Sequence, residues 1–237
     1  MDGRSRVVAI ALLVMLAGCA PRDGELLVFA AASIAAPVAR IAAEFEQLHP
    51  GVRVQVHAAG TPQLVMQIRE GAAADVFVAA DERQMAFVSD NGRVFAQNRL
   101  AVAVPAGNPH RVAGLHDLAR EDLVVALCAI DVPAGRYARM ALARAGVTVR
   151  SVSDEPNVTA LLTKLRLGEI DAAVVYETDV ARAGGDITGI PIAAAHAVEA
   201  RYPVAVLNER PLAGAFDEFL FTEPARRELR AAGFELP

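Results

Sequence analysis

The chain has 237 residues, of which 54% are apolar, 22% are charged and 5% are aromatic, and it contains no tryptophan. This balance excludes a disordered chain, a collagen-like chain and a disulfide-rich scaffold, and the length allows one large domain or two lobes of roughly 100 residues each. The formal charge of −5, with 23 basic and 28 acidic residues and no basic block, argues against a nucleic-acid groove and, on charge alone, against an anionic ligand.

The first residues have the layout of an export signal. Arg4 and Arg6 precede an apolar run over residues 7–17, which is shorter than the ~20 apolar residues that a membrane-spanning helix needs. The run leads into the tetrapeptide LAGC, which resembles the lipobox of bacterial lipoproteins and ends at Cys19. We therefore expect residues 1–18 to be removed as a signal peptide and Cys19 to be lipidated as the new N-terminus. An ordinary signal peptide, with a chance cysteine at this position, is the alternative.

Charge and cysteine content bear on this assignment. Residues 19–25 are expected to form a short lipidated tether, and loss of two arginines and one aspartate with the signal peptide leaves a net charge of −6. Cys128 is the only other cysteine and lies in an apolar run over residues 124–130. It is therefore interpreted as a small buried apolar residue and not as a disulfide partner.

Short β-branched runs alternate with longer amphipathic runs through the rest of the chain. The pattern predicts strands at 26–30, 52–57, 76–79, 101–105, 123–126, 147–152, 172–176 and 203–207. It predicts helices at 37–48, 64–70, 82–90, 136–145 and 158–167, and two closing helices within 212–232 that are split at Pro224. Such alternation is typical of an α/β fold with mostly parallel sheets and helices on their faces.

The motifs of the common enzyme classes are absent from the sequence. It contains no Gly-x-Ser-x-Gly elbow, no His-Glu-x-x-His helix, no Walker loop and no Gly-x-Gly-x-x-Gly turn after a strand. The five histidines, at positions 49, 57, 110, 116 and 196, have no metal-ligand spacing and are interpreted as surface or loop residues. The sequence therefore predicts neither an enzyme nor a metal site.

Polar or small residues follow several predicted strands at the points where helices begin: Ser33, Thr61, Ala134, Val158 and Tyr176. In open α/β sheets, ligands bind beyond the carboxyl ends of the strands, where helix N-termini leave backbone N–H groups free. Each N-terminus carries roughly half a positive elementary charge, so these groups can hold an anion without a cationic side chain. Plain helix capping, as in Thr61 before Pro62, is the alternative explanation of the pattern.

Six segments stand out when the chain is taken in order: FAAAS at 29–33, QI at 67–68 with GA at 71–72, DVFVAAD at 75–81, PAGRY at 133–137, VVY at 174–176 and YPVAV at 202–206. Each is weak by itself. As an ordered set they resemble the molybdate-binding proteins of bacterial ABC importers, and the resemblance covers nearly all of residues 26–237.

The resemblance implies a type II periplasmic-binding-protein-like fold, with two α/β lobes of mostly parallel sheets flanked by helices and a ligand cleft between the lobes. We expect residues 26–103 and 204–237 to form one lobe and residues 104–203 the other. The resemblance also implies a lipid-anchored protein at the extracytoplasmic face of the cell membrane. Such a protein binds molybdate, and tungstate as well, and delivers the bound ion to an ABC permease and its ATPase. A monomer is expected, with no cofactor, no directly coordinated metal and no nucleic-acid partner, because the molybdenum is bound as its oxyanion.

The resemblance also implies a ligand set of neutral hydrogen-bond donors. Ser33 supplies a hydroxyl and its backbone amide, and Thr61 supplies a second hydroxyl. Ala134 and Val158 match the two backbone amides, and Tyr176 matches the tyrosine. Fixed hydroxyls and backbone amides that donate to the ion favour a fully deprotonated oxyanion over a protonated phosphate, which must donate its own proton to an acceptor. Sulfate is also a deprotonated tetrahedron, so the sequence leaves the choice between sulfate and molybdate open.

Three features qualify the assignment of the family's ligand residues to this sequence. The segment Gly-Thr-Pro ending at Pro62 stands where family members commonly show Gly-Ser-Ser, and a proline has no N–H to donate. Pro37 would remove an intrahelical bond if the helix began at Ser33, so Ser33 is expected in a turn before the helix. Arg136 and Arg139 are interpreted as solvated helix residues, because family sites are built from neutral groups.

Two other functions are compatible with an exported protein of this kind. The first is a binding lipoprotein for sulfate or another ligand, such as an organic anion or an iron complex. The second is an exported hydrolase with Ser33 as nucleophile, which would need a histidine such as His57 or His196 within reach.

Overall fold

The computed structural model describes residues 24–237. The predicted signal peptide and the lipidation site at Cys19 lie outside these residues. The strands are β1 (Glu25–Ala31), β2 (Arg53–Ala59), β3 (Val76–Val78), β4 (Arg93–Pro105), β5 (Val125–Cys128), β6 (Ser151–Glu155), β7 (Ala172–Tyr176), β8 (Ile187–Pro191) and β9 (Glu199–Val206). The α-helices are α1 (Ala35–Leu48), α2 (Thr61–Arg69), α3 (Glu82–Met85), α4 (Pro133–Arg144), α5 (Val158–Arg166), α6 (Glu177–Ala183), α7 (Pro211–Phe219) and α8 (Glu223–Ala231).

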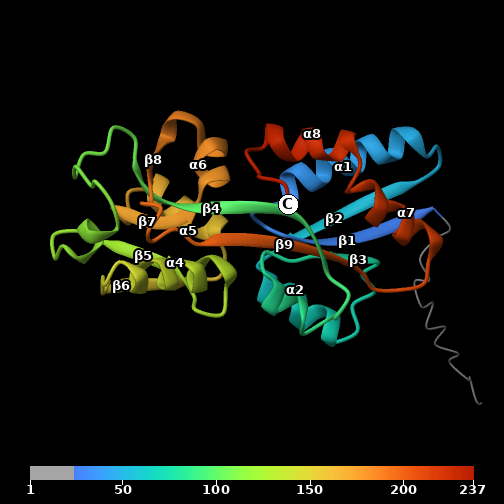
Figure 1. Ribbon diagram of the computed structural model, residues 1–237, viewed down its shortest axis with the longest axis horizontal. Helices are drawn as coiled ribbons and strands as arrows, with labels where there is room; N and C mark the ends of the chain where they lie inside the picture. Colours follow the sequence, from blue (N-terminus) through green and yellow to red (C-terminus); the bar gives the residue numbers. More distant parts are fainter. Residues whose placement is uncertain (1–23) are drawn as a thin grey trace, which may run out of the picture.

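The molecule is elongated and has two halves joined by β4 and β9 (Figure 1). We call β1 to β3 with α1 to α3, α7 and α8 the first lobe, and β5 to β8 with α4 to α6 the second lobe. The strands follow the order β2-β1-β3-β9-β4-β7-β5-β6, and β8 pairs with β4. The α/β fold is as predicted, with two lobes flanked by helices.

Strand pairing is mixed. It is parallel inside each lobe, between β1 and its neighbours β2 and β3 and between β5 and its neighbours β6 and β7. It is antiparallel wherever β4 or β9 takes part. The residues of β4 from Arg93 to Arg99 pair with β9, whereas those from Leu100 to Pro105 pair with β7 and β8. The predicted lobe boundaries, at 103/104 and 203/204, fall inside these two strands and stay predictions.

Helix α1 shows how the sequence pattern forms the core. Val38, Ile41 and Phe45 recur at helical spacing and are fully buried, and the Phe45 ring contacts two rings of α7, Phe216 and Phe219, at centroid distances of 5.2 and 5.3 Å. Pro37 is the third residue of α1, where a backbone N–H has no acceptor inside the helix. The proline therefore removes no intrahelical bond.

Several predicted elements differ from the observed ones. Helix α3 ends at Met85 and the chain continues in turns, so the helix predicted over 82–90 was too long. Strand β4 begins eight residues before its predicted start, because its first half is polar and lacks an apolar run. Strand β6 lies at Ser151–Glu155, beyond most of the range 147–152. Helix α6 and strand β8 were not predicted.

Two smaller findings concern Cys128 and the membrane. Cys128 is a free, buried cysteine, as predicted, and burial raises the pKa of its thiol well above the usual range. Within residues 24–237, no helix combines the length and the apolar character needed to cross a bilayer.

Candidate functional site

A small cavity lies between the two lobes. Its volume is about 20 Å³, a little more than the ~10–15 Å³ that one water molecule needs. All five residues predicted as ligands are among those that line it: Ser33, Thr61, Ala134, Val158 and Tyr176. The fold therefore brings together residues that are as much as 143 positions apart, counted from Ser33 to Tyr176.

Each of these residues stands at the carboxyl end of a strand. Ser33 lies in the turn between β1 and α1, as expected from Pro37, and Thr61 is the first residue of α2, after β2. Ala134 is the second residue of α4, which follows β5, and Val158 is the first residue of α5, after β6. Tyr176 ends β7. The two lobes thus present their strand ends to one cleft, the place where open α/β sheets bind ligands.

The two hydroxyls from the first lobe each accept a hydrogen bond from the protein. Ser33 Oγ accepts one from the Tyr202 hydroxyl at 3.1 Å, and Thr61 Oγ1 accepts one from the backbone N–H of Ala80 at 3.4 Å. Ser33 and Thr61 are both buried. Because the oxygens already receive a proton from a neighbour, their own O–H protons are left to donate.

Tyr176 contributes the third hydroxyl. It is 1% exposed, and its Oη has no hydrogen-bond partner among the described residues. Burial raises the pKa of this phenol well above its usual value, so the group stays neutral and keeps its proton. A buried hydroxyl without a partner costs about 1–3 kcal/mol, which points to a binding partner that the protein itself does not supply.

The second lobe also presents two helix N-termini. The N–H groups of Ala134 and Val158 lie in the first turns of α4 and α5, where no acceptor exists inside the helix. The Asn157 side chain caps α5 by accepting from the N–H of Ala160 at 2.9 Å, so the cap leaves the Val158 N–H free. Among residues 24–237, those that line the cavity include no charged side chain. The cavity is therefore electropositive through dipoles alone.

Neither Arg136 nor Arg139 lines the cavity, as the sequence led us to expect, but the interpretation of their side chains as solvated was wrong. Arg136 Nε donates to the Asp81 carboxylate at 3.0 Å, across the cleft from α4 to the N-cap residue of α3. Arg139 Nη1 donates to the backbone carbonyls of Cys128 at 2.7 Å and Gly135 at 3.1 Å. Both guanidinium groups are engaged with the protein, because α4 lies against the cleft on one side and against β5 on the other.

The hydrolase alternative finds little support in the geometry. His57 Nε2 is 3.1 Å from Gln67 Oε1, and the His196 ring is paired with His116 at a centroid distance of 6.1 Å. No histidine in the described part of the chain lines the cavity that holds Ser33. Ser33 therefore has no imidazole base beside it here.

Two residues at the site were missed by the sequence analysis. Tyr202 lies in the YPVAV segment, but its bond to Ser33 spans 169 residues, so only the fold reveals it. Gly60 lines the cavity, and a Cβ added to it would lie 2.5 Å from the carbonyl oxygen of Pro156 in the second lobe. The glycine thus permits close approach of the two lobes. Pro62, the second residue of α2, does not line this cavity.

Comparisons with known proteins identify the family of the chain. Residues 26–235 match the family described as bacterial extracellular solute-binding protein. The molybdate-binding protein ModA of Mycobacterium tuberculosis is 34% identical over 222 residues, which cover 90% of this chain and 85% of that protein.

Solved structures share the fold. The periplasmic molybdate-binding protein of Azotobacter vinelandii has a TM-score of 0.74 at 19% identity, over 90% of this chain and 99% of that one. The sulfate-binding protein SubI of Mycobacterium tuberculosis has a TM-score of 0.74 at 17% identity, over 90% of this chain and 86% of that one. These two structures show that the fold is common to proteins named for different oxyanions.

Proposed function

Because the chain belongs to the molybdate-binding branch of the bacterial extracellular solute-binding proteins, we propose that it captures molybdate, and also tungstate, in the cavity between its lobes. The unpartnered hydroxyl of Tyr176, buried among other free donors, carries this proposal. In this proposal the oxyanion is held by five residues: Ser33, Thr61, Ala134, Val158 and Tyr176.

The donor set supports a fully deprotonated oxyanion. A buried dianion is stable only when its oxygens are hydrogen-bonded, and a bond to a charged group contributes about 1.5–3 kcal/mol. The cavity offers hydroxyl and amide protons from both lobes, and a protonated phosphate would need an acceptor as well. Molybdate and tungstate meet this condition. Sulfate meets it too, and the shared fold of a sulfate-binding protein makes sulfate the second candidate.

In the proposed cycle the ligand favours the closed arrangement. Ser33 and Thr61 belong to the first lobe and the other three donors to the second, so only closure brings all five against one ion. The closed monomer then delivers its ion to an ABC permease and its ATPase without any catalytic step, cofactor or nucleic acid. Residues 26–103 with 204–237 and residues 104–203 would move as the two bodies.

Calorimetric titration with molybdate, tungstate, sulfate and phosphate tests the ligand. We expect saturable heat with molybdate and tungstate and none with phosphate. Tight sulfate binding without a molybdate response would replace the proposal by its second candidate.

We further propose that lipidated Cys19 holds the protein at the extracytoplasmic face of the membrane. Cys19→Ser should release the protein from the membrane fraction into the soluble extracytoplasmic fraction. A variant that stays with the membrane would contradict the anchor while leaving the ligand proposal untouched.

A further inference from the structure

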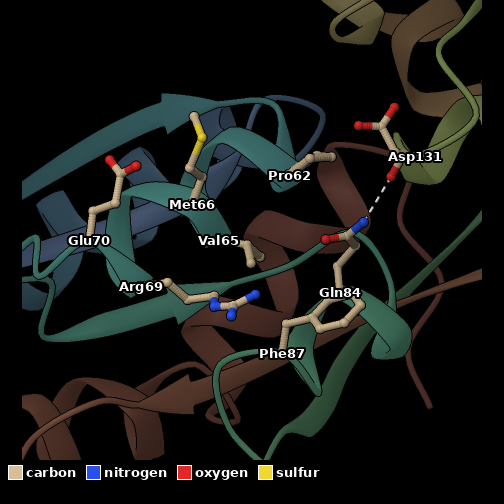
Figure 2. Close-up of a pocket in the computed structure, with 8 residues that line it drawn as sticks. All are labelled: Pro62, Val65, Met66, Arg69, Glu70, Gln84, Phe87 and Asp131. Carbon is tan, nitrogen blue, oxygen red and sulfur yellow. Dashed lines mark hydrogen bonds between the residues drawn. The ribbon is translucent and has the colours of Figure 1, made fainter.

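Two polar contacts join the lobes beside the cavity. Asp81, in the first lobe, forms an ion pair with Arg136 of α4, in which Arg136 Nε donates to Oδ2 at 3.0 Å and Nη2 donates to the same oxygen. Gln84 of α3 donates through Nε2 to the backbone carbonyl of Asp131 at 2.8 Å. Figure 2 shows this second bond, with the Gln84 side chain reaching from α3 towards the loop that precedes α4.

The ion pair is held in place on both sides. Asp81 Oδ1 accepts a bond from the backbone N–H of Gln84 at 2.6 Å and so caps α3, which fixes the carboxylate in the first lobe. The Asp81 side chain is 1% exposed, and that of Arg136 is 25% exposed. The guanidinium also lies over the Tyr137 ring, 4.5 Å from its centroid.

The pair adjoins the ligand cavity. Ala80 lines the cavity and precedes Asp81, and Ala134 lines it two residues before Arg136. A buried carboxylate without a partner at this point would repel an oxyanion, so the neutralising guanidinium matters electrostatically as well as mechanically. Because the carboxylate comes from one lobe and the guanidinium from the other, the pair can form only when the lobes are closed.

We propose that the Asp81–Arg136 ion pair sets how long the closed protein retains its ligand. This inference rests on the proposed function. It gives Arg136 a positioning role: the side chain does not touch the ion, but it couples retention of the ligand to closure of the lobes. Opening must break the pair and the Gln84–Asp131 bond before the donors can separate.

The test is the molybdate dissociation rate, measured by stopped-flow displacement for wild type, Arg136→Gln, Asp81→Asn and the double variant. Arg136→Gln should raise the rate about tenfold or more, because it leaves a buried carboxylate unpaired beside the anion. Asp81→Asn should raise it less, since asparagine keeps the helix cap and the remaining cation attracts the ligand. The double variant should dissociate more slowly than Arg136→Gln alone, because the unpaired carboxylate is gone.

Arg210→Gln is the matched control. Arg210 pairs with Asp75 at 2.7 Å, with side-chain exposures of 25% and 4%, but both residues lie in the first lobe. This variant should lower the midpoint of thermal unfolding. It should leave the dissociation rate within about twofold of wild type, because the pair does not bridge the lobes and distant sites without shared partners act independently.

Three results would decide against the assignment. Wild-type dissociation rates in both Arg136→Gln and Asp81→Asn would overturn it, and so would an equal acceleration in Arg210→Gln. Absence of any molybdate heat with the wild type would instead refute the proposed function, and the ion-pair role with it.

Discussion

The hydroxyl of Tyr202 donates to Ser33 Oγ at 3.1 Å, and both groups are buried where β9 meets the turn after β1. This bond makes the Ser33 oxygen an acceptor from the protein and leaves its own proton free to donate. Tyr202→Phe removes the hydroxyl and keeps the ring packed against Phe234, 5.3 Å away between centroids. We expect molybdate affinity to fall about three- to tenfold, in line with one neutral hydrogen bond.

A double-mutant cycle checks this prediction by calorimetry. If Tyr202 acts through Ser33, then Tyr202→Phe should cost nothing further in a Ser33→Ala background. Fully additive losses would show that Tyr202 acts by another route.

Tyr176→Phe should affect ligand binding and stability in opposite directions. We expect molybdate affinity to fall about tenfold or more, because a donor to a charged ligand is lost. The ligand-free protein should become more stable by about 1 kcal/mol, because a buried hydroxyl without a partner is removed. Titration and urea unfolding of the same variant measure the two effects. Ser33→Ala should weaken binding more than Tyr176→Phe does, and unchanged titrations for both variants would contradict the site.

Gly60→Ala should impair closure and leave folding nearly unchanged. The φ of Gly60 is −61°, which any residue adopts, so an alanine there has no backbone strain. Its Cβ would lie 2.5 Å from the Pro156 carbonyl oxygen of the other lobe, however, and the lobes would have to stay apart. We expect a loss of molybdate affinity of about tenfold or more, as is usual for a strained contact of 1–3 kcal/mol.

Gly214→Ala controls for the loss of a glycine, because an added Cβ there meets nothing within 4 Å. It should bind molybdate as the wild type does. Small-angle scattering in the presence of ligand should show that the Gly60→Ala variant is more extended than the Gly214→Ala variant. Equal radii of gyration would contradict the role of Gly60 in closure.

The buried carboxyl group of Asp179 should give the protein an unusual dependence of stability on pH. Burial raises the pKa of this carboxyl from its ordinary 3.8 to about 6, although Arg182 and the Tyr176 N–H oppose the shift. Between these two values the folded state holds a proton that the unfolded state has lost, so the contribution of Asp179 to stability is lost as pH rises from about 4 to about 6. Above about pH 6 both states are ionised and the dependence ends.

Urea unfolding of wild type and Asp179→Asn isolates this group. The difference in free energy of unfolding, wild type minus variant, should fall by up to about 3 kcal/mol between about pH 4 and about pH 7. A difference that is constant over this range would show that Asp179 titrates normally.

Net charge predicts the salt dependence of capture. The full chain carries a formal charge of −5, and the proposed removal of residues 1–18 would make it −6. At either charge the protein repels an approaching dianion, although the cavity itself is electropositive. Raising ionic strength from about 0.01 M to about 0.15 M shortens the Debye length from ~30 to ~8 Å and should therefore raise the molybdate association rate. Stopped-flow association rates that fall with salt would indicate local steering by cations instead.

The sequence predicted which residues lie at the ends of strands better than it predicted the contacts between distant residues. Ser33, Thr61, Ala134, Val158 and Tyr176 could be placed because strand-to-helix junctions carry a local signal and the family segments fix their order. Arg136 could not be interpreted correctly, because its partner Asp81 lies 55 positions away and no periodicity connects them. Helix α6 was missed because its seven residues are too few for a helical pattern, and its first turn is held by the Tyr176 N–H to Asp179 bond.

The two strands that join the lobes are bonded to each other, since β4 pairs with β9 from Arg93 to Arg99, with a bulge between Val94 and Ala96. A paired ribbon of this kind bends and twists but does not stretch or slide, and bulges increase its twist. The lobes thus have few directions in which to move apart. In the proposed cycle, this ribbon would return the donors of both lobes to the same register after each release, so that one protein could serve many rounds of capture with the same geometry.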